Sequence, residues 1–460
     1  MSSGGSGTLL MRVLRQQRHK QLRRSVSSWS SSWPMQRALA AMTWDAAAAA
    51  AAGAESVSSP SALRAVPDER LREASQFRVG STLPREFEFD TSAQPFELVQ
   101  PDLQRMADSV RHSVSLGADH PVLNAAASYF FAKQGKRMRP TMVLLLAHAA
   151  AAPGSPATGI MDSGAAPHSD ASQMRQCSEA TGAEHRDSAL FARQLKLAEI
   201  TEMIHVASVL HDDVIDVADT RRGAASANVA FGNQLAVLAG DFLLARASMA
   251  LARLRDCDVV ETLSSVIEHL VCGEVLQMHH AAQQSEQASA DALMQAYLSK
   301  TYFKTASLMA HSCKASIMLL DEQGSNRFPK LREAAYLYGE KLGMAFQLVD
   351  DALDFASSST VFGKPSAGAD LRAGLTTAPV LFAMERAPFI RQAMQRKYRG
   401  EGDVNAAFDA VLQFDGVPKT MQLAHAYATD AVVALCEAFP PSEYRSGLVN
   451  LANHVLQRSH

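Results

Sequence analysis

Two short aspartate clusters, each set in apolar, alanine-rich sequence, constrain this chain more than any other feature. Residues 212–216 read DDVID and residues 350–354 read DDALD. Residues four apart on an α-helix share a face, so the outer carboxylates of each cluster point the same way. Grouping carboxylates in apolar surroundings is costly unless a cation balances them. Such dense oxygen ligands suit Mg²⁺, which completes its shell with water and phosphate oxygens.

The rest of the chain reads as helix. We expect helices at about 186–217, 232–254, 259–284, 290–320, 330–355, 376–388, 404–413, 418–438 and 442–457, where apolar residues recur with a helical period. No alternating strand pattern of any length stands out, and no glycine-rich nucleotide loop is found. The sequence therefore predicts an all-α bundle.

Both clusters stand at the ends of apolar helical runs, residues 199–211 and 343–349. From these ends the two clusters could face each other across a cavity. Acidic ends above an apolar cavity predict an enzyme that binds a diphosphate head and stores a hydrocarbon tail.

Further motifs lie around the clusters in a fixed order. Residues 135–140 read GKRMRP, His205 precedes Asp212 by seven residues, and residues 221–223 read RRG. GEVLQ follows at 273–277, Lys304-Thr305 comes next, and FQLV at 346–349 leads into the second cluster. In this combination the chain resembles the trans-isoprenyl diphosphate synthases, of the long-chain mitochondrial type, over roughly residues 95–460.

The resemblance implies an isoprenoid-synthase helical bundle around a central apolar cavity, and it implies roles for individual residues. The cations and the histidine expected at isopentenyl diphosphate are Lys136, Arg139, Arg222 and His205. The residues expected at the allylic diphosphate are Arg221, Lys304, Thr305 and Gln347. Asp212, Asp216 and Asp350 would hold Mg²⁺, with Asp213, Asp351 and Asp354 in support.

The implied reaction is a Mg²⁺-dependent prenyl transfer. Charge drawn from the allylic diphosphate ionises its C–O bond, the double bond of isopentenyl diphosphate attacks the cation, and a proton leaves with the released diphosphate. The expected function is a long-chain all-trans-polyprenyl diphosphate synthase that supplies the ubiquinone side chain. GLTT at 374–377 resembles the mitochondrial long-chain form. A shorter-chain farnesyl or geranylgeranyl synthase, or one subunit of a heteromeric synthase, are the alternatives.

Product length is argued from two small residues below the first cluster. Ala207 and Ser208 lie roughly 6–8 Å along the helix from Asp212. A large ring there would floor the pocket, and its absence favours a product of about C40 to C50 by analogy with the family.

Three other classes fit less well. A class I terpene cyclase would need no GKxxRP motif and normally mixes Asn, Ser and Glu in its second metal site. A non-catalytic binding subunit would be expected to have lost one acidic cluster. A purely structural helical protein would have no reason to place six aspartates at two helix ends.

The N-terminal segment differs in kind from the rest. Residues 1–44 contain no Asp or Glu but carry seven Arg or Lys residues among many serines. This composition predicts a mitochondrial transit peptide and a matrix location. Arg12-Val13 followed by His19-Lys20 comes close to a peroxisome-type address, which is kept as a minor alternative.

Composition bounds the remaining organisation. Residues 45–94 read as a low-complexity linker, and residues 152–184 read as a disordered insert in the domain at 95–460. A net charge of −3 gives no reason to expect nucleic acid, and five scattered cysteines predict neither zinc nor disulfides. No membrane span is expected, whereas peripheral membrane contact for product release is left open. A homodimer, or a heteromer with a related subunit, is predicted on helices near 232–284.

Overall fold

The structure is a computed structural model. It describes residues 89–115, 121–129, 131, 137–158, 188–221, 224–280, 288–321, 325–356 and 368–458. The chain divides into two units, Met1–Ser59 and Pro60–His460, and every described residue belongs to the second. The predicted transit peptide, almost all of the predicted linker and most of the predicted insert lie outside the described residues.

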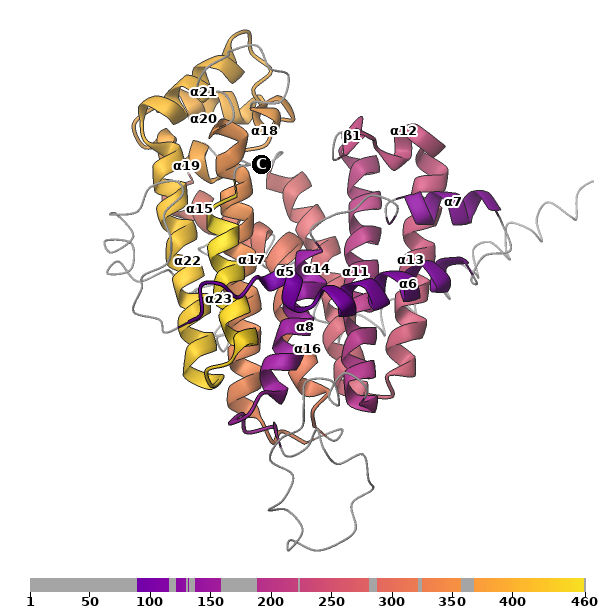
Figure 1. Cartoon of the computed structure of the whole chain (residues 1–460). Coiled ribbons are helices and arrows are strands. Elements are labelled where there is room, and N and C mark those ends of the chain that lie inside the picture. Colours follow the sequence, from indigo (N-terminus) through magenta and orange to yellow (C-terminus); the bar gives the residue numbers. More distant parts are fainter. Residues whose placement is uncertain are drawn as a thin grey trace, which may run out of the picture. The chain divides into compact units, whose positions relative to one another are not determined.

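Helices make up most of the described chain, which confirms the predicted all-α class (Figure 1). The N-terminal helices are α5 (Pro95–Leu98), α6 (Gln100–Ser115), α7 (Pro121–Tyr129) and α8 (Met138–Ala151). The central helices are α11 (Ala189–Ile215), α12 (Ala227–Phe231), α13 (Asn233–Arg253), α14 (Cys257–His280), α15 (Ala290–Thr301), the π-helical turn η2 (Tyr302–Ala306) and α16 (Ser307–Met318). The C-terminal helices are α17 (Pro329–Ala356), α18 (Ala369–Arg372), α19 (Ala378–Met384), α20 (Phe389–Gln395), α21 (Asp403–Gln413), α22 (Gly416–Ala438) and α23 (Glu443–Leu456).

Beyond the insert, the short helices α12, α18 and α20 lie outside the predicted ranges, and two further features depart from them. The single helix expected at 290–320 is interrupted by η2, which separates α15 from α16. A small antiparallel hairpin pairs β1 (Thr220–Arg221) with β2 (Ala224–Ala225) just after the first aspartate cluster. Each strand is two residues long, too short to show an alternating pattern.

The core forms where long helices lie side by side. α11 packs along α13, and α17 packs along both α16 and α22. α8 contacts α11, α16 and α23, and all its residues from Pro140 to Ala150 are buried. A helix that is apolar on every side can only be stable when it is enclosed in this way.

Two glycines on α17 permit close packing of this helix against its neighbours. A Cβ atom at Gly339 would lie 2.6 Å from the Met309 carbonyl oxygen, and one at Gly343 would lie 2.7 Å from the Ala306 Cα atom. Both neighbours are backbone atoms, which cannot rotate away. Because these two positions carry no side chain, α17 can approach α16 and η2 closely.

One described helix is long and apolar enough to suit a membrane span by length and composition alone. Its 18-residue window has a mean hydropathy of 1.6, and a third of that window is buried. This helix is α13, and helices in protein cores pass the same test. The sequence-based expectation of no span did not anticipate it. Its exposed side carries Leu238 and Met249, 55% and 46% exposed.

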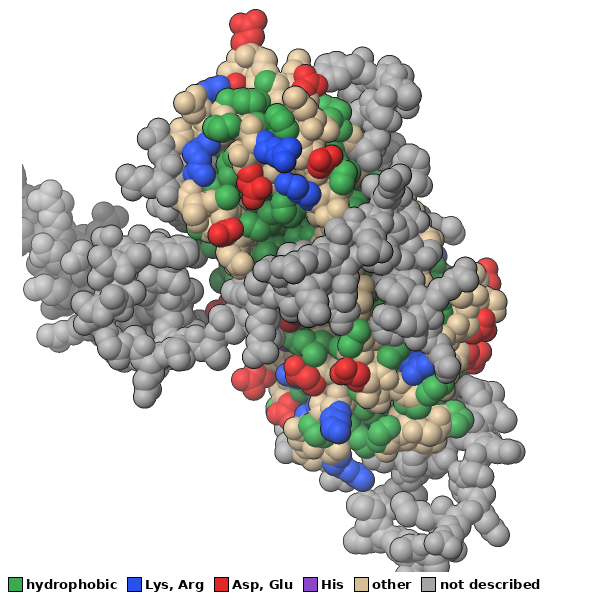
Figure 2. Space-filling model, turned by 90° about the vertical axis from the view of Figure 1, so that its left-hand side faces the viewer, with side chains coloured by type: hydrophobic (Ala, Val, Ile, Leu, Met, Phe, Trp, Pro, Cys, Tyr) green, Lys and Arg blue, Asp and Glu red, His purple; other side chains and the backbone are tan. Residues whose placement is uncertain are grey.

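The surface elsewhere is mixed in charge. On the face that Figure 2 shows, Lys and Arg side chains lie among Asp and Glu side chains and exposed apolar groups. The first residues of the predicted insert, 152–158, form a turn in which Ala152 and Ala157 are buried.

Candidate active site

The first aspartate cluster ends α11. Ser188 caps the start of this helix by accepting a hydrogen bond from the Phe191 backbone N–H, and Asp216 is its last, C-capping residue. Asp213 is buried and accepts hydrogen bonds from Arg221 Nε at 3.0 Å and Nη2 at 2.6 Å. The β1–β2 hairpin thus folds Arg221 back onto the cluster, and Asp213 is already neutralised by the protein.

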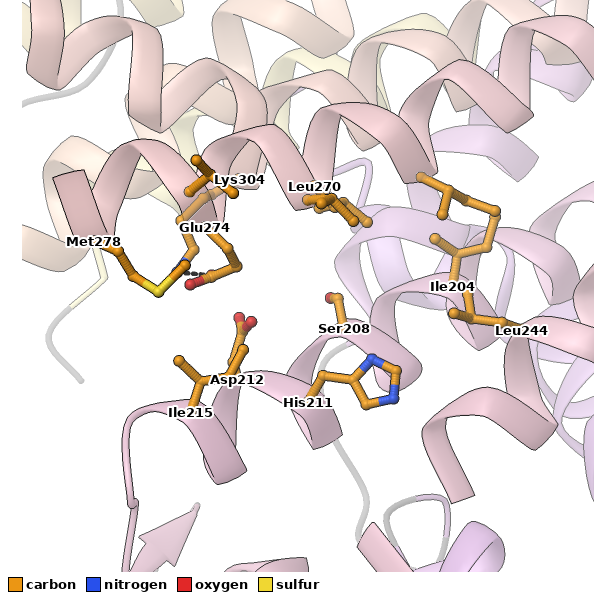
Figure 3. Close-up of a pocket in the computed structure, with 13 residues that line it drawn as sticks. Ile204, Ser208, His211, Asp212, Ile215, Leu244, Leu270, Glu274, Met278 and Lys304 are labelled. Carbon is orange, nitrogen blue, oxygen red and sulfur yellow. Dashed lines mark ion pairs between the residues drawn. The ribbon is translucent and has the colours of Figure 1, made fainter. Parts of the chain in front are cut away.

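Asp212 lies among charged groups from two other elements. Glu274 of α14 and Lys304 of η2 form an ion pair opposite it (Figure 3). Burial, opposed by the positive charge of Lys304 and assisted by the negative charge of Glu274, raises the pKa of Asp212 to about 7. Burial likewise raises the pKa of Asp216. These two carboxylates occupy a place where negative charge is in excess.

Gly273 explains how Lys304 reaches this position. A Cβ atom at Gly273 would lie 2.7 Å from Lys304 Cγ and 3.1 Å from the Lys304 backbone nitrogen. Because no side chain stands there, α14 and η2 can pack closely enough to pair Glu274 with Lys304.

The second cluster lies near the end of α17 and is tied into a hydrogen-bond chain. Thr305 Oγ1 donates to Gln347 Oε1 at 3.0 Å, and Gln347 Nε2 donates to Asp351 Oδ1 at 2.8 Å. Tyr297 of α15 donates to Asp351 Oδ2 at 2.6 Å. Burial raises the pKa of Asp351 to about 6, against the opposing effects of Lys300 and these hydrogen bonds.

The other two aspartates of this cluster have different partners. Asp354 accepts hydrogen bonds from the backbone N–H groups of Ala369 and Asp370, at 3.0 and 3.2 Å. Asp350 is half exposed and pairs with Arg458 Nη2 at 3.0 Å. The guanidinium of Arg458 also stacks over the Phe346 ring at 4.3 Å. The end of the described chain thus returns to the second cluster.

The π-helical turn η2 joins the two clusters. Lys304 faces Glu274 and Asp212, whereas the next residue, Thr305, begins the chain that leads to Asp351. π-helical turns are rare and occur often at functional sites. Two consecutive side chains of one turn therefore connect carboxylates that are far apart in sequence.

An apolar cavity of about 260 Å³ lies below Asp212. Asp212, Glu274 and Lys304 form one end, and Ile204, Leu244 and Leu270 lie toward the other (Figure 3). Ser208 lines this cavity, whereas its neighbour Ala207 is fully buried and is not among the lining residues. We therefore keep Ser208 as the position that faces the cavity.

Arg139 and His205 lie together as expected for a shared anion site. Arg139 Nη1 and His205 Nε2 are 3.2 Å apart. The other two cations predicted there, Lys136 and Arg222, lie outside the described residues.

Several site residues were missed by reasoning from sequence. They are Glu274, Tyr297, Lys300, Asp370 and Arg458. Burial raises the pKa of Asp370 to about 7, and Asp351 and Asp354 add to that shift. Glu274 stood within the GEVLQ motif and could have been named. Tyr297 and Arg458 meet their partners only through tertiary packing.

The donor set fits divalent cations, although no described group of three or more His, Cys, Asp or Glu residues forms a complete metal cage. Asp212 and Asp216 are desolvated carboxylates with raised pKa values, the state in which a cation is most strongly favoured. Mg²⁺ commonly takes only one or two carboxylates and completes its shell with water and phosphate oxygens.

Comparison with known proteins decides the family. The sequence pattern described as "Polyprenyl synthetase" matches residues 120–411. The chain belongs to the polyprenyl synthetase family. As a member of this family it is a prenyltransferase, and the family relies on a divalent metal.

Relatives of this polyprenyl synthetase cover most of its length. It is 43% identical to a probable mitochondrial hexaprenyl pyrophosphate synthase of Neurospora crassa, over 79% of this chain and 82% of that one. It is 41% identical to the mitochondrial solanesyl-diphosphate synthase 1 of Oryza sativa, over 79% of both chains. The mitochondrial names of these relatives support a mitochondrial location.

A solved structure shares its fold. A polyprenyl synthase from Caulobacter crescentus, complexed with calcium and isoprenyl diphosphate, superposes with a TM-score of 0.63 at 29% identity, covering 82% of this chain and all of that one. That protein was thus solved with a divalent cation and a prenyl diphosphate together.

Proposed function

We propose that this polyprenyl synthetase is a long-chain all-trans-polyprenyl diphosphate synthase that condenses an allylic diphosphate with successive isopentenyl diphosphates. The observation that carries the proposal is the polar chain through η2, which links Asp212 to Asp351 above an apolar cavity. A charged end over an apolar space fits a substrate with a diphosphate head and a hydrocarbon tail.

The six aspartates divide into two groups by their partners. Asp213, Asp351 and Asp354 are held by protein donors, so they would orient the clusters. We infer that Mg²⁺ would be held by Asp212, Asp216 and Asp350, and when bound it would supply positive charge to the departing diphosphate. Asp350 must first release Arg458.

The remaining polar groups would position the two substrates. Lys304 and Thr305 face the allylic diphosphate from one turn, and Arg221 stands beside it. Arg139 and His205, with Lys136 and Arg222, would bind the isopentenyl diphosphate. The allylic C–O bond breaks, the new C–C bond forms at the isopentenyl double bond, and the proton is lost to the released diphosphate. The protein contributes alignment and charge stabilisation in a site shielded from water.

The product is assigned to the long-chain class used for the ubiquinone side chain. The relatives named above include hexaprenyl and solanesyl synthases, so the proposed range begins below about C40 and extends toward C50. The cavity of about 260 Å³ is small for such a tail, and the growing chain must pass beyond Ile204 and Leu244.

The test of this function is diphosphate release with and without Mg²⁺, with the product length read by chromatography. Asp212→Ala and Asp350→Ala should each abolish turnover while helical content stays unchanged, because the core does not depend on these carboxylates. Asp108→Ala, at an exposed aspartate of α6, is the matched control. If both site variants kept more than about a tenth of wild-type turnover, the metal assignment would be abandoned.

We further propose import into the mitochondrial matrix through residues 1–44. The absence of acids and the seven basic residues support this segment as the import signal. A reporter fused to residues 1–60 should enter mitochondria. A cytosolic reporter, or one that enters peroxisomes, would contradict the proposal.

The assembly is proposed to be a homodimer, or a heteromer with a related subunit, built on α13 and α14. Val271 and Met278 of α14 line the cavity and are nevertheless 59% and 53% exposed. Leu238 and Met249 add exposed apolar surface on α13. A partner covering these side chains would close the cavity wall that a single copy leaves open.

A further inference from the structure

A second cavity, of about 250 Å³, lies between α11 and α13 near α6. Four cations line it: Arg193 and Lys196 from α11, and Arg246 and Arg253 from α13. None of these residues has a role in prenyl transfer as proposed above.

The charges of this basic pocket do not cancel. Lys196 pairs with Glu199 at 2.6 Å, and Arg193 reaches Asp256 at 3.5 Å. Within the described part of the chain, Arg246 and Arg253 form no ion pair. Four cations against two carboxylates leave a surplus of two positive charges, and arginine keeps its charge at any physiological pH.

The basic pocket is separate from the candidate active site. It shares no lining residue with the cavity below Asp212. Lys196 precedes Asp212 by sixteen residues on α11, which places their Cα atoms about 24 Å apart along the helix. A substrate diphosphate held at the aspartates is therefore out of reach of Lys196 and of Arg193, which lies still farther along α11.

We propose that the basic pocket binds a small phosphate-bearing group, such as a phosphate or diphosphate with a short apolar stem. Two unpaired guanidinium groups match phosphate oxygens in geometry and charge. The same pocket has an apolar side, formed by Ala192, Met203, Ala250 and Leu254. Its volume fits a head group and the first carbons attached to it, but not a long tail.

Two sources share this chemistry: a membrane phospholipid with an acidic head group, and a soluble diphosphate compound. The test compares the variant Arg246→Gln/Arg253→Gln with the control Arg386→Gln/Arg399→Gln. The control also removes two positive charges, from exposed residues outside the pocket. Inorganic diphosphate is titrated calorimetrically into metal-free protein in EDTA, and flotation is measured with vesicles of phosphatidylcholine alone or mixed with phosphatidic acid.

We expect binding of at least one probe to weaken about tenfold or more in the pocket variant alone, since the substitutions remove the charge-assisted hydrogen bonds of two guanidinium groups. Loss of the diphosphate titration indicates a soluble ligand. A lipid head group is indicated if only flotation is lost, and only with the vesicles that contain phosphatidic acid. Equal binding of both probes by the pocket variant, the control and the wild type overturns the proposal.

Turnover separates this result from a failure of the active site. The pocket variant should keep wild-type diphosphate release, because the basic pocket shares no lining residue with the cavity below Asp212. Arg253→Gln alone, at an exposed residue, provides a second variant if the double substitution disturbs folding. It should show the same selective loss to a smaller degree, and wild-type binding of both probes by a folded Arg253→Gln protein would count against the proposal.

Discussion

Individual aspartates in the two clusters differ in what surrounds them. Asp213 faces an arginine, and Asp351 faces a tyrosine and a glutamine, whereas Asp212 faces another carboxylate. Protein donors on the oxygens of a carboxylate compete with a metal ion for the same lone pairs. The immediate neighbours thus distinguish Asp213 and Asp351 from Asp212, whereas Asp350, also a proposed ligand, becomes available to a metal ion only when Arg458 leaves it.

Gly273 gives a sharp test of the site at the scale of one residue. Gly273→Ala would place a methyl group 2.7 Å from Lys304 Cγ, so the lysine must move away from Glu274 and Asp212. We expect turnover to fall about ten- to a hundredfold, as a displacement near 1 Å commonly costs. Steady-state kinetics with both diphosphate substrates measures this fall.

The control for Gly273→Ala is Ser265→Ala on the same helix, which should keep wild-type kinetics. Both variants should melt within a few degrees of the wild type. Unchanged turnover in a folded Gly273→Ala protein would show that Lys304 has no role that depends on its position.

The sequence predicted the residues that belong to short local patterns and missed those that arrive by packing. His205 and Arg139 were paired correctly in space from motifs 66 positions apart. Arg458 was missed because its contact with Asp350 spans 108 positions and leaves no local pattern. The metal, diphosphate and chain-length roles themselves remain predictions that the experiments above address.

At the scale of elements, one face of α11 forms a wall of the cavity. Ile204, Ser208, His211, Asp212 and Ile215 line it, at the spacing of a single helical face. Ala207 lies to the side of this face, in the core. Two adjacent small residues looked equivalent in sequence because the direction of the helix face was unknown.

Ser208→Phe should shorten the product. A ring at this position would fill the cavity one turn below Asp212, so elongation should stop near C15 to C20 while each addition proceeds. Reversed-phase chromatography of the released prenyl alcohols measures the length. Ala207→Tyr is the contrast: it should overpack the core and cost about 1–3 kcal/mol of stability. If a folded, active Ser208→Phe enzyme still released the wild-type product, α11 would not form the wall of the tunnel.

A pair of histidines, His269 and His311, lies beside η2, with the His269 ring next to the rings of Tyr302 and Phe303. His269 Nδ1 lies 2.6 Å from Ser307 Oγ, and His311 Nδ1 lies 2.8 Å from the Ser307 carbonyl oxygen. Burial lowers the pKa of both histidines, that of His311 to about 4, and Lys314 adds to the effect on His311. Both are thus neutral in the folded protein at pH 7.

These pKa values predict a loss of stability in mild acid. Below about pH 6.5 His311 binds a proton in the unfolded chain, whereas in the folded chain it binds one only near pH 4. Acid therefore favours the unfolded state. The free energy of unfolding should fall by about 2 kcal/mol between pH 7.5 and 5 from this residue. Urea titrations measure it.

His311→Gln should reduce that dependence, and His112→Gln, at an exposed histidine of α6, should not. Aspartates with raised pKa values act in the opposite direction, since protonation relieves their burial as the pH falls. Their contribution is common to all three proteins and cancels in the comparison. Identical slopes for wild type and His311→Gln would contradict the prediction.

At the scale of the whole molecule, the exposed apolar side chains of α13 and α14 favour a subunit interface on these two helices. Leu238→Glu/Met249→Glu should convert the assembly to monomers at micromolar concentration, because two buried charges at an apolar interface are strongly unfavourable. Light scattering measures the mass. Leu412→Glu, at an exposed leucine of α21, is the matched control and should leave the assembly intact.

Helical class and most long helices could be predicted because apolar periodicity is a local property. α13 and α22 were placed to within two residues at each end. The turn η2 was not foreseen, since its residues continue an ordinary helical pattern and the break is a change in backbone hydrogen bonding at Tyr302–Ala306. Short helices such as α12 and α18 bury too few side chains to leave a periodic signal.

The contact of Arg458 with Asp350 and Phe346 has a practical meaning for handling the protein. Anything joined to the chain after His460 starts two residues from a side chain that touches a proposed metal ligand. An affinity tag or fluorescent protein in that position would therefore be expected to disturb the contact between Arg458 and Asp350. A purification handle inserted after residue 44, downstream of the proposed import signal, would avoid this contact.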